Sequence, residues 1–228
     1  MRRRILWLRA YWPLLASLLF LVFSLLFLWA CTGFAMPTQE LALVRLEQQA
    51  ILPRGTTVAR GSVRMEHAFP ADDPPSSFTW VLRQYEDGYR LFKLQHFLGL
   101  WRDTSTPWLD TNFPLSEPLC LTILENSMYN ESLGWKDGMP DWTWYSEICA
   151  LAFTTDPAVE RVEATVGWRG GAQNGDHLTT LSLTETAPDS GIWLLQTDVS
   201  MPDSGSLSYT CRAYDAAGTL LCTYSNEN

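Results

Sequence analysis

The chain begins with a long apolar segment and continues with short runs in which apolar and polar residues alternate. Residues 10–39 contain no charged side chain, and residues 13–28 consist of Leu, Phe, Val, Ala and Ser after one proline. A bilayer core about 30 Å thick requires roughly 20 apolar residues in helical form. The pattern therefore predicts a transmembrane helix over residues 11–36.

The charges around this segment predict its orientation. Arg2, Arg3, Arg4 and Arg9 precede it, and no further basic residue follows until Arg45. Basic residues next to a span stay on the cytoplasmic side. We therefore expect residues 1–10 to be a cytoplasmic tail and the bulk of the chain to be extracytoplasmic, in a single-pass protein of the cell membrane.

Three fates of the segment remain open. The apolar run is longer than in most cleaved signals, which favours an uncleaved signal anchor. Gly33-Phe34-Ala35 would also fit a cleavage site, and Leu28-Trp29-Ala30-Cys31 resembles a bacterial lipobox with lipidation at Cys31. Each of the three fates leaves the remaining residues outside the membrane.

Residues 37–52 predict a short helix next to the membrane. Thr38 can cap a helix over Gln39–Leu52, and Glu40 favours its first turn. Pro53 ends it. We expect this juxtamembrane helix to act as a stalk.

Beyond Pro53 the apolar spacing changes to a period of two, which is typical of strands. The clearest hairpin joins Phe78–Tyr85 to Tyr89–Phe97 through the three-residue loop Glu86–Gly88, with glycine at the left-handed position. Residues 53–115 are therefore predicted to form an antiparallel β meander. The expected cross-strand pairs are Tyr85 with Tyr89, Leu82 with Phe92 and Trp80 with Leu94.

The last part of the chain, residues 116–228, predicts a β-sandwich. Several short alternating runs are separated by turn signals, which is typical of antiparallel sandwiches. Together with the meander, this makes the chain a mainly β protein behind an N-terminal helix.

A weak resemblance accompanies this pattern. The stretch Thr155–Glu163, with its turn and following strand, and the hairpin Ala213–Leu221 resemble small immunoglobulin-like sandwich domains of membrane-anchored, uncharacterised extracytoplasmic proteins of Gram-positive bacteria. The resemblance covers about residues 145–225. It implies a fold and a location, and it carries no catalytic residue to this chain.

Four cysteines follow the membrane segment, and an exported location permits disulfides. If Asp215–Gly218 is a four-residue loop, Cys211 lies opposite Cys222 and the two can form a disulfide. A three-residue loop with a glycine bulge would shift the strand and separate them. Nothing local decides whether Cys120 and Cys149 pair.

The charge balance excludes some partners. All 25 acidic residues follow Met36, whereas four of the 16 basic residues precede it, so residues 37–228 carry a net charge of about −13. Nucleic-acid binding relies on basic contacts to phosphate, so we expect no nucleic-acid partner. The sequence contains no calcium loop, catalytic motif or cofactor fingerprint, and we predict no metal site, no cofactor and no catalytic residue.

One stretch has the composition of a ligand-binding loop. Four aromatic residues and several carboxylates lie within residues 131–147, where glycine and proline interrupt the pattern. Flat rings can stack on sugar faces, while carboxylates accept hydrogen bonds from hydroxyl groups. The same rings can equally cap the sandwich as core residues. The candidate ligand-binding residues are Trp135, Asp137, Asp141, Trp142, Trp144 and Tyr145.

These patterns predict a membrane-anchored binding or interaction module at the cell surface, with a cell-wall glycan or a surface protein as partner. Two alternatives remain. A cell-wall glycan hydrolase would use two carboxylates near residues 137–147, at a separation that the sequence does not give. An accessory subunit of a membrane complex would dock through the apolar helix.

Overall fold

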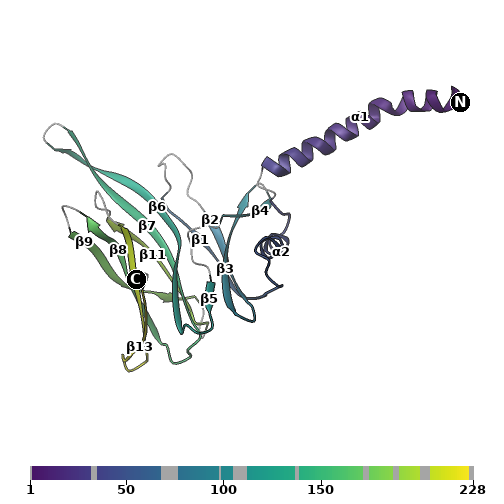
Figure 1. Cartoon of the computed structure of the whole chain (residues 1–228). Coiled ribbons are helices and arrows are strands. Elements are labelled where there is room, and N and C mark those ends of the chain that lie inside the picture. Colours follow the sequence, from purple (N-terminus) through teal and green to yellow (C-terminus); the bar gives the residue numbers. More distant parts are fainter. Residues whose placement is uncertain are drawn as a thin grey trace.

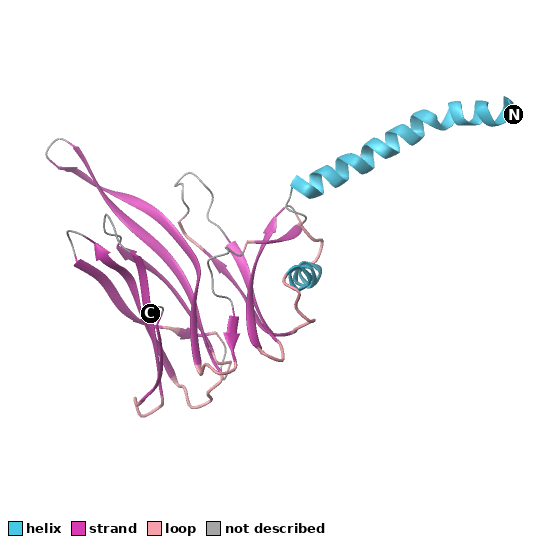
Figure 2. Cartoon of the chain, viewed as in Figure 1, coloured by secondary structure: helices cyan, strands magenta, loops and turns pink. Residues whose placement is uncertain are grey.

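The computed structural model shows a mainly β protein with two helices (Figures 1 and 2). It describes residues 2–31, 35–67, 77–97, 99–104, 112–136, 139–171, 175–186, 190–200 and 206–225. All strand pairings between its named strands are antiparallel.

Helix α1, Arg2–Cys31, extends away from the β structure (Figure 1). Large apolar side chains are exposed on it along residues 11–27, including Phe20 at 75% and Phe27 at 72%. We expected a membrane span here. Within the part of the chain that the structure describes, no helix meets the length and apolarity that a membrane crossing requires.

Helix α2, Gln39–Gln49, is capped as predicted, because the Thr38 hydroxyl accepts a hydrogen bond from the backbone N–H of Leu41 at 3.3 Å. It ends three residues earlier than expected, where Ile51 adopts a positive φ of 56°. It is not a free stalk: Ala42, Leu43 and Glu47 are buried against the neighbouring sheet.

This first sheet has the order β1-β2-β3-β4, with β5 paired to β3. One face packs on α2 through Val81, Phe92 and Leu94, and the other packs on the next sheet through Trp80 and Leu82. Its strands are β1 Thr56–Arg64, β2 Ser77–Gln84, β3 Gly88–Phe97, β4 Leu100–Asp103 and β5 Asn112–Pro114.

The predicted register of the β2–β3 hairpin is wrong by one residue. Tyr85 N–H donates to the Gly88 carbonyl at 2.8 Å, so the loop is shorter, and Trp80 lies opposite Lys93. Both faces of this sheet are buried, so the apolar pattern could not decide between the two registers. Gly88 is required for another reason: a Cβ there would lie 2.5 Å from the Phe113 carbonyl oxygen in β5.

Residues 119–225 form two further four-stranded sheets. The middle sheet has the order β10-β11-β7-β6 and the outer sheet the order β13-β12-β8-β9. The strands of the middle sheet are β6 Leu119–Lys136, β7 Met139–Thr154, β10 Thr184–Glu185 and β11 Ile192–Ser200. Those of the outer sheet are β8 Arg161–Gly171, β9 Gly175–Ser182, β12 Ser206–Tyr214 and β13 Leu220–Ser225.

The middle sheet lies between the other two and is buried on both faces. On β7, Ile148, Ala150 and Ala152 contact the outer sheet, whereas Cys149 and Leu151 contact the first sheet. This explains why residues 148–153 are continuously apolar instead of alternating. The predicted meander and the predicted sandwich therefore share a core.

The last hairpin adopts the second of the two registers that the sequence left open. Asp215 N–H donates to the Thr219 carbonyl at 3.0 Å around a three-residue loop, and a bulge follows, so that Cys211 lies opposite Tyr224. Cys211 and Cys222 are therefore not opposite each other, and both are free cysteines in this structure. Burial raises the pKa of the Cys211 thiol to about 12.

Candidate functional site

The aromatic stretch predicted as a loop is instead part of the long β6–β7 ribbon. Its backbone is paired across the two strands: Ser132 lies opposite Trp142, and Trp135 lies opposite Pro140. The third strand, β11, ends at Ser200 opposite Tyr145. From that point the ribbon continues with two strands, and Figure 1 shows it reaching beyond the neighbouring sheets.

The predicted site residues fall into two groups. The structure describes the side chains of Trp144 and Tyr145: Trp144 is 41% exposed and Tyr145 is half-buried. Asp137 and the side chains of Trp135, Asp141 and Trp142 lie outside what the structure describes. Because Trp144 and Tyr145 are consecutive in a strand, they lie on opposite faces of the ribbon.

Tyr145 belongs to a stack of three aromatic rings at the base of the ribbon. Tyr129 lies opposite it on β6, with ring centroids 5.5 Å apart and an interplanar angle of 20°. His67, just after β1, stacks on Tyr129 with centroids 3.7 Å apart and an angle of 8°. Folding the sequence about Asp137-Gly138 would place Tyr129 opposite Ser146, and the register shift between Ser132 and Gly134 brings Tyr145 opposite it instead. No local signal therefore reveals this pair, and none connects His67 to it.

Glu147 fixes the chain at His67 to the middle sheet. Its carboxylate accepts hydrogen bonds from the backbone N–H groups of Glu66, at 3.0 Å, and His67, at 2.7 Å, and from Gln196 Nε2 at 2.6 Å. His67 Nδ1 lies 3.4 Å from the same carboxylate. Gln196 Nε2 also donates to the Arg64 carbonyl at 2.9 Å, which joins β11 to the end of β1.

These donors keep Glu147 ionised. Burial alone would raise its pKa, but the hydrogen bonds from Glu66, His67 and Gln196, with the charge of His67, lower the pKa below its ordinary value. A carboxylate in this state is a poor general acid. Glu147 was one of the carboxylates in the predicted ligand-binding stretch, and its contacts give it a structural role.

A buried ion pair lies near Glu147, between the first and middle sheets. Lys93 contacts Glu125, and its ammonium group lies 4.6 Å from the centroid of the Phe78 ring. The neighbouring thiol of Cys149 is buried, which raises its pKa to about 12. A thiol with this pKa is protonated at neutral pH and is a weak nucleophile.

The arrangement is suited to binding. It offers the half-exposed indole of Trp144 and, beside it, the stacked rings of Tyr145, Tyr129 and His67. The ionised Glu147 holds the backbone of His67 in place. Among the described residues, no group of three or more His, Cys, Asp or Glu is placed to hold a metal ion. No protein-family model and no curated protein matches this chain.

Proposed function

We propose that the protein is a membrane-anchored binding module that presents the β6–β7 ribbon to a ligand at the cell surface. One observation carries the proposal: the ribbon extends beyond the end of β11 and bears Trp144 with 41% of its surface exposed. A two-stranded ribbon gains little stability by itself in water. Its length and its exposed indole are therefore better explained by a ligand than by folding.

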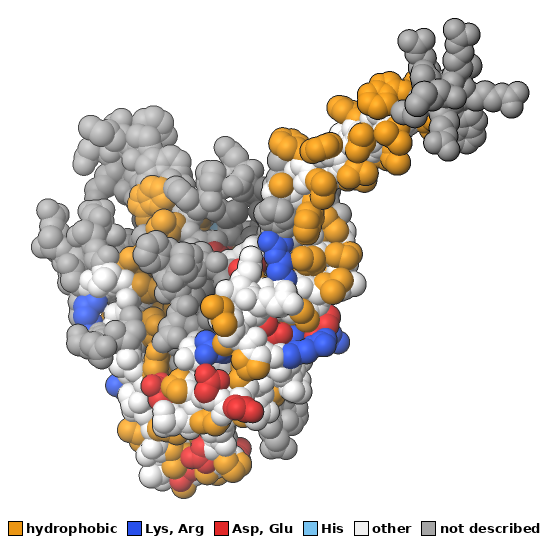
Figure 3. Space-filling view, turned by 45° about the vertical axis from the view of Figure 1, so that its right-hand side comes forward, with side chains coloured by type: hydrophobic (Ala, Val, Ile, Leu, Met, Phe, Trp, Pro, Cys, Tyr) orange, Lys and Arg blue, Asp and Glu red, His pale blue; other side chains and the backbone are white. Residues whose placement is uncertain are grey.

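The anchoring part of the proposal rests on the uncharged residues 10–39 and on the exposure of α1. Leu and Phe side chains are exposed on this helix from Leu14 to Phe27, and Figure 3 shows hydrophobic side chains along much of it. Apolar surface of this extent is unfavourable in water and favourable in lipid. The four arginines before the helix favour a cytoplasmic N-terminus.

The strand order of the two later sheets supports an immunoglobulin-like fold. If β6 to β13 are labelled A, B, C, C′, D, E, F and G, the middle sheet has the order D-E-B-A and the outer sheet G-F-C-C′. Immunoglobulin-like sandwiches place strands A, B, E and D in one sheet and C, F and G in the other. Domains of this architecture serve many functions, so the binding role rests on the ribbon and not on the fold.

Glycans are the ligand class that the ribbon suits best. An exposed indole can stack on the apolar face of a sugar ring, and the ribbon contains two further tryptophans, Trp135 and Trp142, within ten residues of Trp144. The strongly acidic second half of the chain disfavours anionic polymers. A neutral or basic cell-wall polysaccharide is therefore the proposed ligand.

The test is a pull-down of the full chain, purified in detergent, on insoluble cell wall and on neutral polysaccharides. We expect retention that the variant Trp142→Ala/Trp144→Ala loses. Trp193→Phe, a buried substitution remote from the ribbon, serves as the control. If wild type and double variant are retained equally, or neither is retained, the glycan proposal is wrong.

An accessory role in a membrane complex is a second candidate, favoured by the exposure of α1. Trp12 is 62% exposed and lies on the same helix as the exposed Leu and Phe side chains. Such a helix can pack against another membrane helix as well as against lipid. Cross-linking in the membrane that recovers a partner through α1, combined with no glycan retention, would favour this role.

A further inference from the structure

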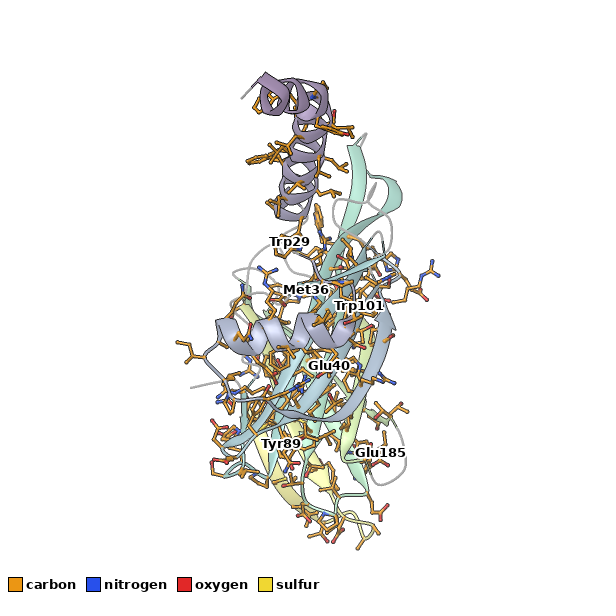
Figure 4. The ribbon with its side chains drawn as sticks, turned by 90° about the vertical axis from the view of Figure 1, so that its right-hand side faces the viewer. Trp29, Met36, Glu40, Tyr89, Trp101 and Glu185 are labelled. Carbon is orange, nitrogen blue, oxygen red and sulfur yellow. The ribbon has the colours of Figure 1, made fainter. Side chains whose placement is uncertain are left out.

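A concave site lies at the end of β7 opposite to the ribbon. It is about 320 Å³ in volume and is bounded by β1, β3, the β7–β8 connection and the turn before β11. Because β7 runs from the ribbon at Met139 to Thr154, the ribbon and this cavity lie at opposite ends of one strand. Figure 4 labels Tyr89 and Glu185, two of the lining residues, on the part of the molecule remote from α1.

The inner wall of the cavity is apolar and aromatic. Tyr89 and Phe153 both line it, and their rings pack with centroids 4.6 Å apart and an interplanar angle of 60°. Val58 and Val159 add aliphatic surface. A wall of this kind suits a ligand with an apolar stem.

The polar part of the cavity is acidic. Asp156, Glu160 and Glu185 line it, and none of the described residues that line it is a lysine or an arginine. Two of the carboxylates are fixed by their own loops: Asp156 accepts from the Ala158 N–H at 2.9 Å and Glu185 from the Gly191 N–H at 3.2 Å. A carboxylate has about four acceptor positions, so each keeps capacity for another donor.

We infer that this cavity binds an organic cation, an ammonium or guanidinium group on an aliphatic stem. Three carboxylates supply the opposite charge, the tyrosine ring supplies a surface that attracts cations, and the two valines accommodate the stem. Lysine and arginine side chains of a partner protein have this chemistry, and so do free aliphatic amines. This site is independent of the ribbon and of the function proposed for it.

The experiment measures binding of Nα-acetyl-lysine amide and Nα-acetyl-arginine amide, whose side chains keep their charge, to the full chain in detergent by saturation-transfer NMR. Acetyl-norleucine amide, which has a similar stem without the charge, is the control ligand. We expect saturable binding of at least one charged probe and none of norleucine amide. Absence of saturable binding of both charged probes, or equal binding of norleucine amide, would overturn the inference.

Variants assign the binding to the cavity. Asp156→Asn/Glu160→Gln/Glu185→Gln keeps the side-chain shapes and the oxygen acceptors of the loops, and we expect it to weaken binding about tenfold or more. The matched control removes the same charge from exposed residues that do not line the cavity, as Glu66→Gln/Glu86→Gln/Asp198→Asn. Equal weakening by both triple variants would show a general effect of net charge and would overturn the site.

A third arm separates the two sources of the cation. Five-residue peptides that carry one central lysine or arginine are compared with the single amino-acid amides. Tighter binding of a peptide supports a protein partner, whereas equal affinity supports a small free amine, and both outcomes support a cation site. Circular dichroism of each variant verifies that it is folded.

Discussion

Glu147 illustrates how one buried carboxylate can fix a remote segment of the chain. It lies on β7, is 3% exposed, and binds two consecutive backbone N–H groups that lie 80 residues earlier in the sequence. Burial opposes its charge, and the hydrogen bonds from these donors outweigh that effect and lower its pKa. The position of His67 over Tyr129 therefore depends on the charge of Glu147.

Replacing Glu147 by glutamine should reduce the free energy of unfolding by about 2 kcal/mol at neutral pH, because hydrogen bonds to a charged group are weakened. The folded-state pKa of Glu147 is lowered, so its contribution is complete above the ordinary carboxyl pKa and is lost as the pH falls through the folded value. Urea unfolding of wild type and Glu147→Gln from pH 7 to pH 3 measures this difference. The control is Glu86→Gln on an exposed turn; a difference that stays constant over this range would contradict the prediction.

The cysteines give a second prediction at this scale. Burial raises the pKa values of Cys149 and Cys211 to about 12, so neither thiol should react appreciably with iodoacetamide at pH 8 in the folded protein. Both should react after denaturation without prior reduction, because they are free. Mass spectrometry of alkylated peptides measures this, and protection of Cys211 and Cys222 in unreduced, denatured protein would show that they form a disulfide.

At the scale of elements, the sequence predicted strands but not how they pair. Period-two spacing located β2 and β3 to within one residue at each end, because each strand has side chains directed alternately to two faces. It did not give the registers of the two hairpins, since one-residue shifts are undetectable where both faces are apolar and where a bulge such as that at Ala213 intervenes. The stack at Tyr129 and the cavity at Tyr89 join residues far apart in the chain, which no local pattern reveals.

The docking of α2 depends on a buried ion pair. Glu47 Oε1 lies 3.2 Å from Arg83 Nε and accepts hydrogen bonds from Tyr85 Oη at 2.7 Å and from Gly55 N–H at 2.8 Å. Burial and the hydrogen bond to Glu47 raise the pKa of the Tyr85 hydroxyl, so this hydroxyl stays protonated and remains a hydrogen-bond donor. The pair therefore connects α2, the residues before β1, and β2.

Removing one partner of this pair should cost more than removing both. Glu47→Leu leaves Arg83 charged and buried, with the half-exposed Glu40 at 3.4 Å as its remaining acidic partner, and we expect it to lower the free energy of unfolding by about 3 kcal/mol. Glu47→Leu/Arg83→Met removes both charges and should recover a large part of that loss. Urea unfolding of the two variants is the measurement; a double variant that is less stable than the single one would show that the pair is not coupled.

Gly191 lies just before β11 and packs closely against the backbone of Thr154 at the end of β7. Its φ is +63°, and a Cβ there would meet the Thr154 carbonyl oxygen, whereas Gly218, with φ +80°, has open space around it. Gly218→Ala should cost about 1–2 kcal/mol, which is the cost of the left-handed backbone. Gly191→Ala should cost more than about 3 kcal/mol, because the clash adds to the same backbone cost. Equal destabilisation of the two variants in urea unfolding would rule out the close contact.

At the scale of the whole molecule, the layers separate the β6–β7 ribbon and the acidic cavity from α1. The order is α2, first sheet, middle sheet and outer sheet, with α1 leading away from the side of α2 and β4 (Figures 1 and 4). Trp29 Nε1 donates to the Ala35 carbonyl at 2.9 Å, and Met36 pairs with Trp101 on β4. Within the described residues, the chain that follows α1 is therefore joined to the first sheet.

This arrangement should let changes in α1 be studied without changing the ribbon or the acidic cavity. Leu18→Asp/Leu25→Asp places two charges in the apolar part of α1 and should release the protein from membranes on alkaline carbonate extraction, because each charge in a bilayer costs about 3 kcal/mol. The wild-type chain should remain in the pellet, as should the control Leu18→Ala/Leu25→Ala. Glycan retention in detergent should be the same for all three proteins, since α1 extends away from the β structure and none of the described residues that line the acidic cavity belongs to it. A doubly charged variant that stays in the pellet would contradict anchoring by α1, and one that loses glycan retention would show that the anchor and the ribbon depend on each other.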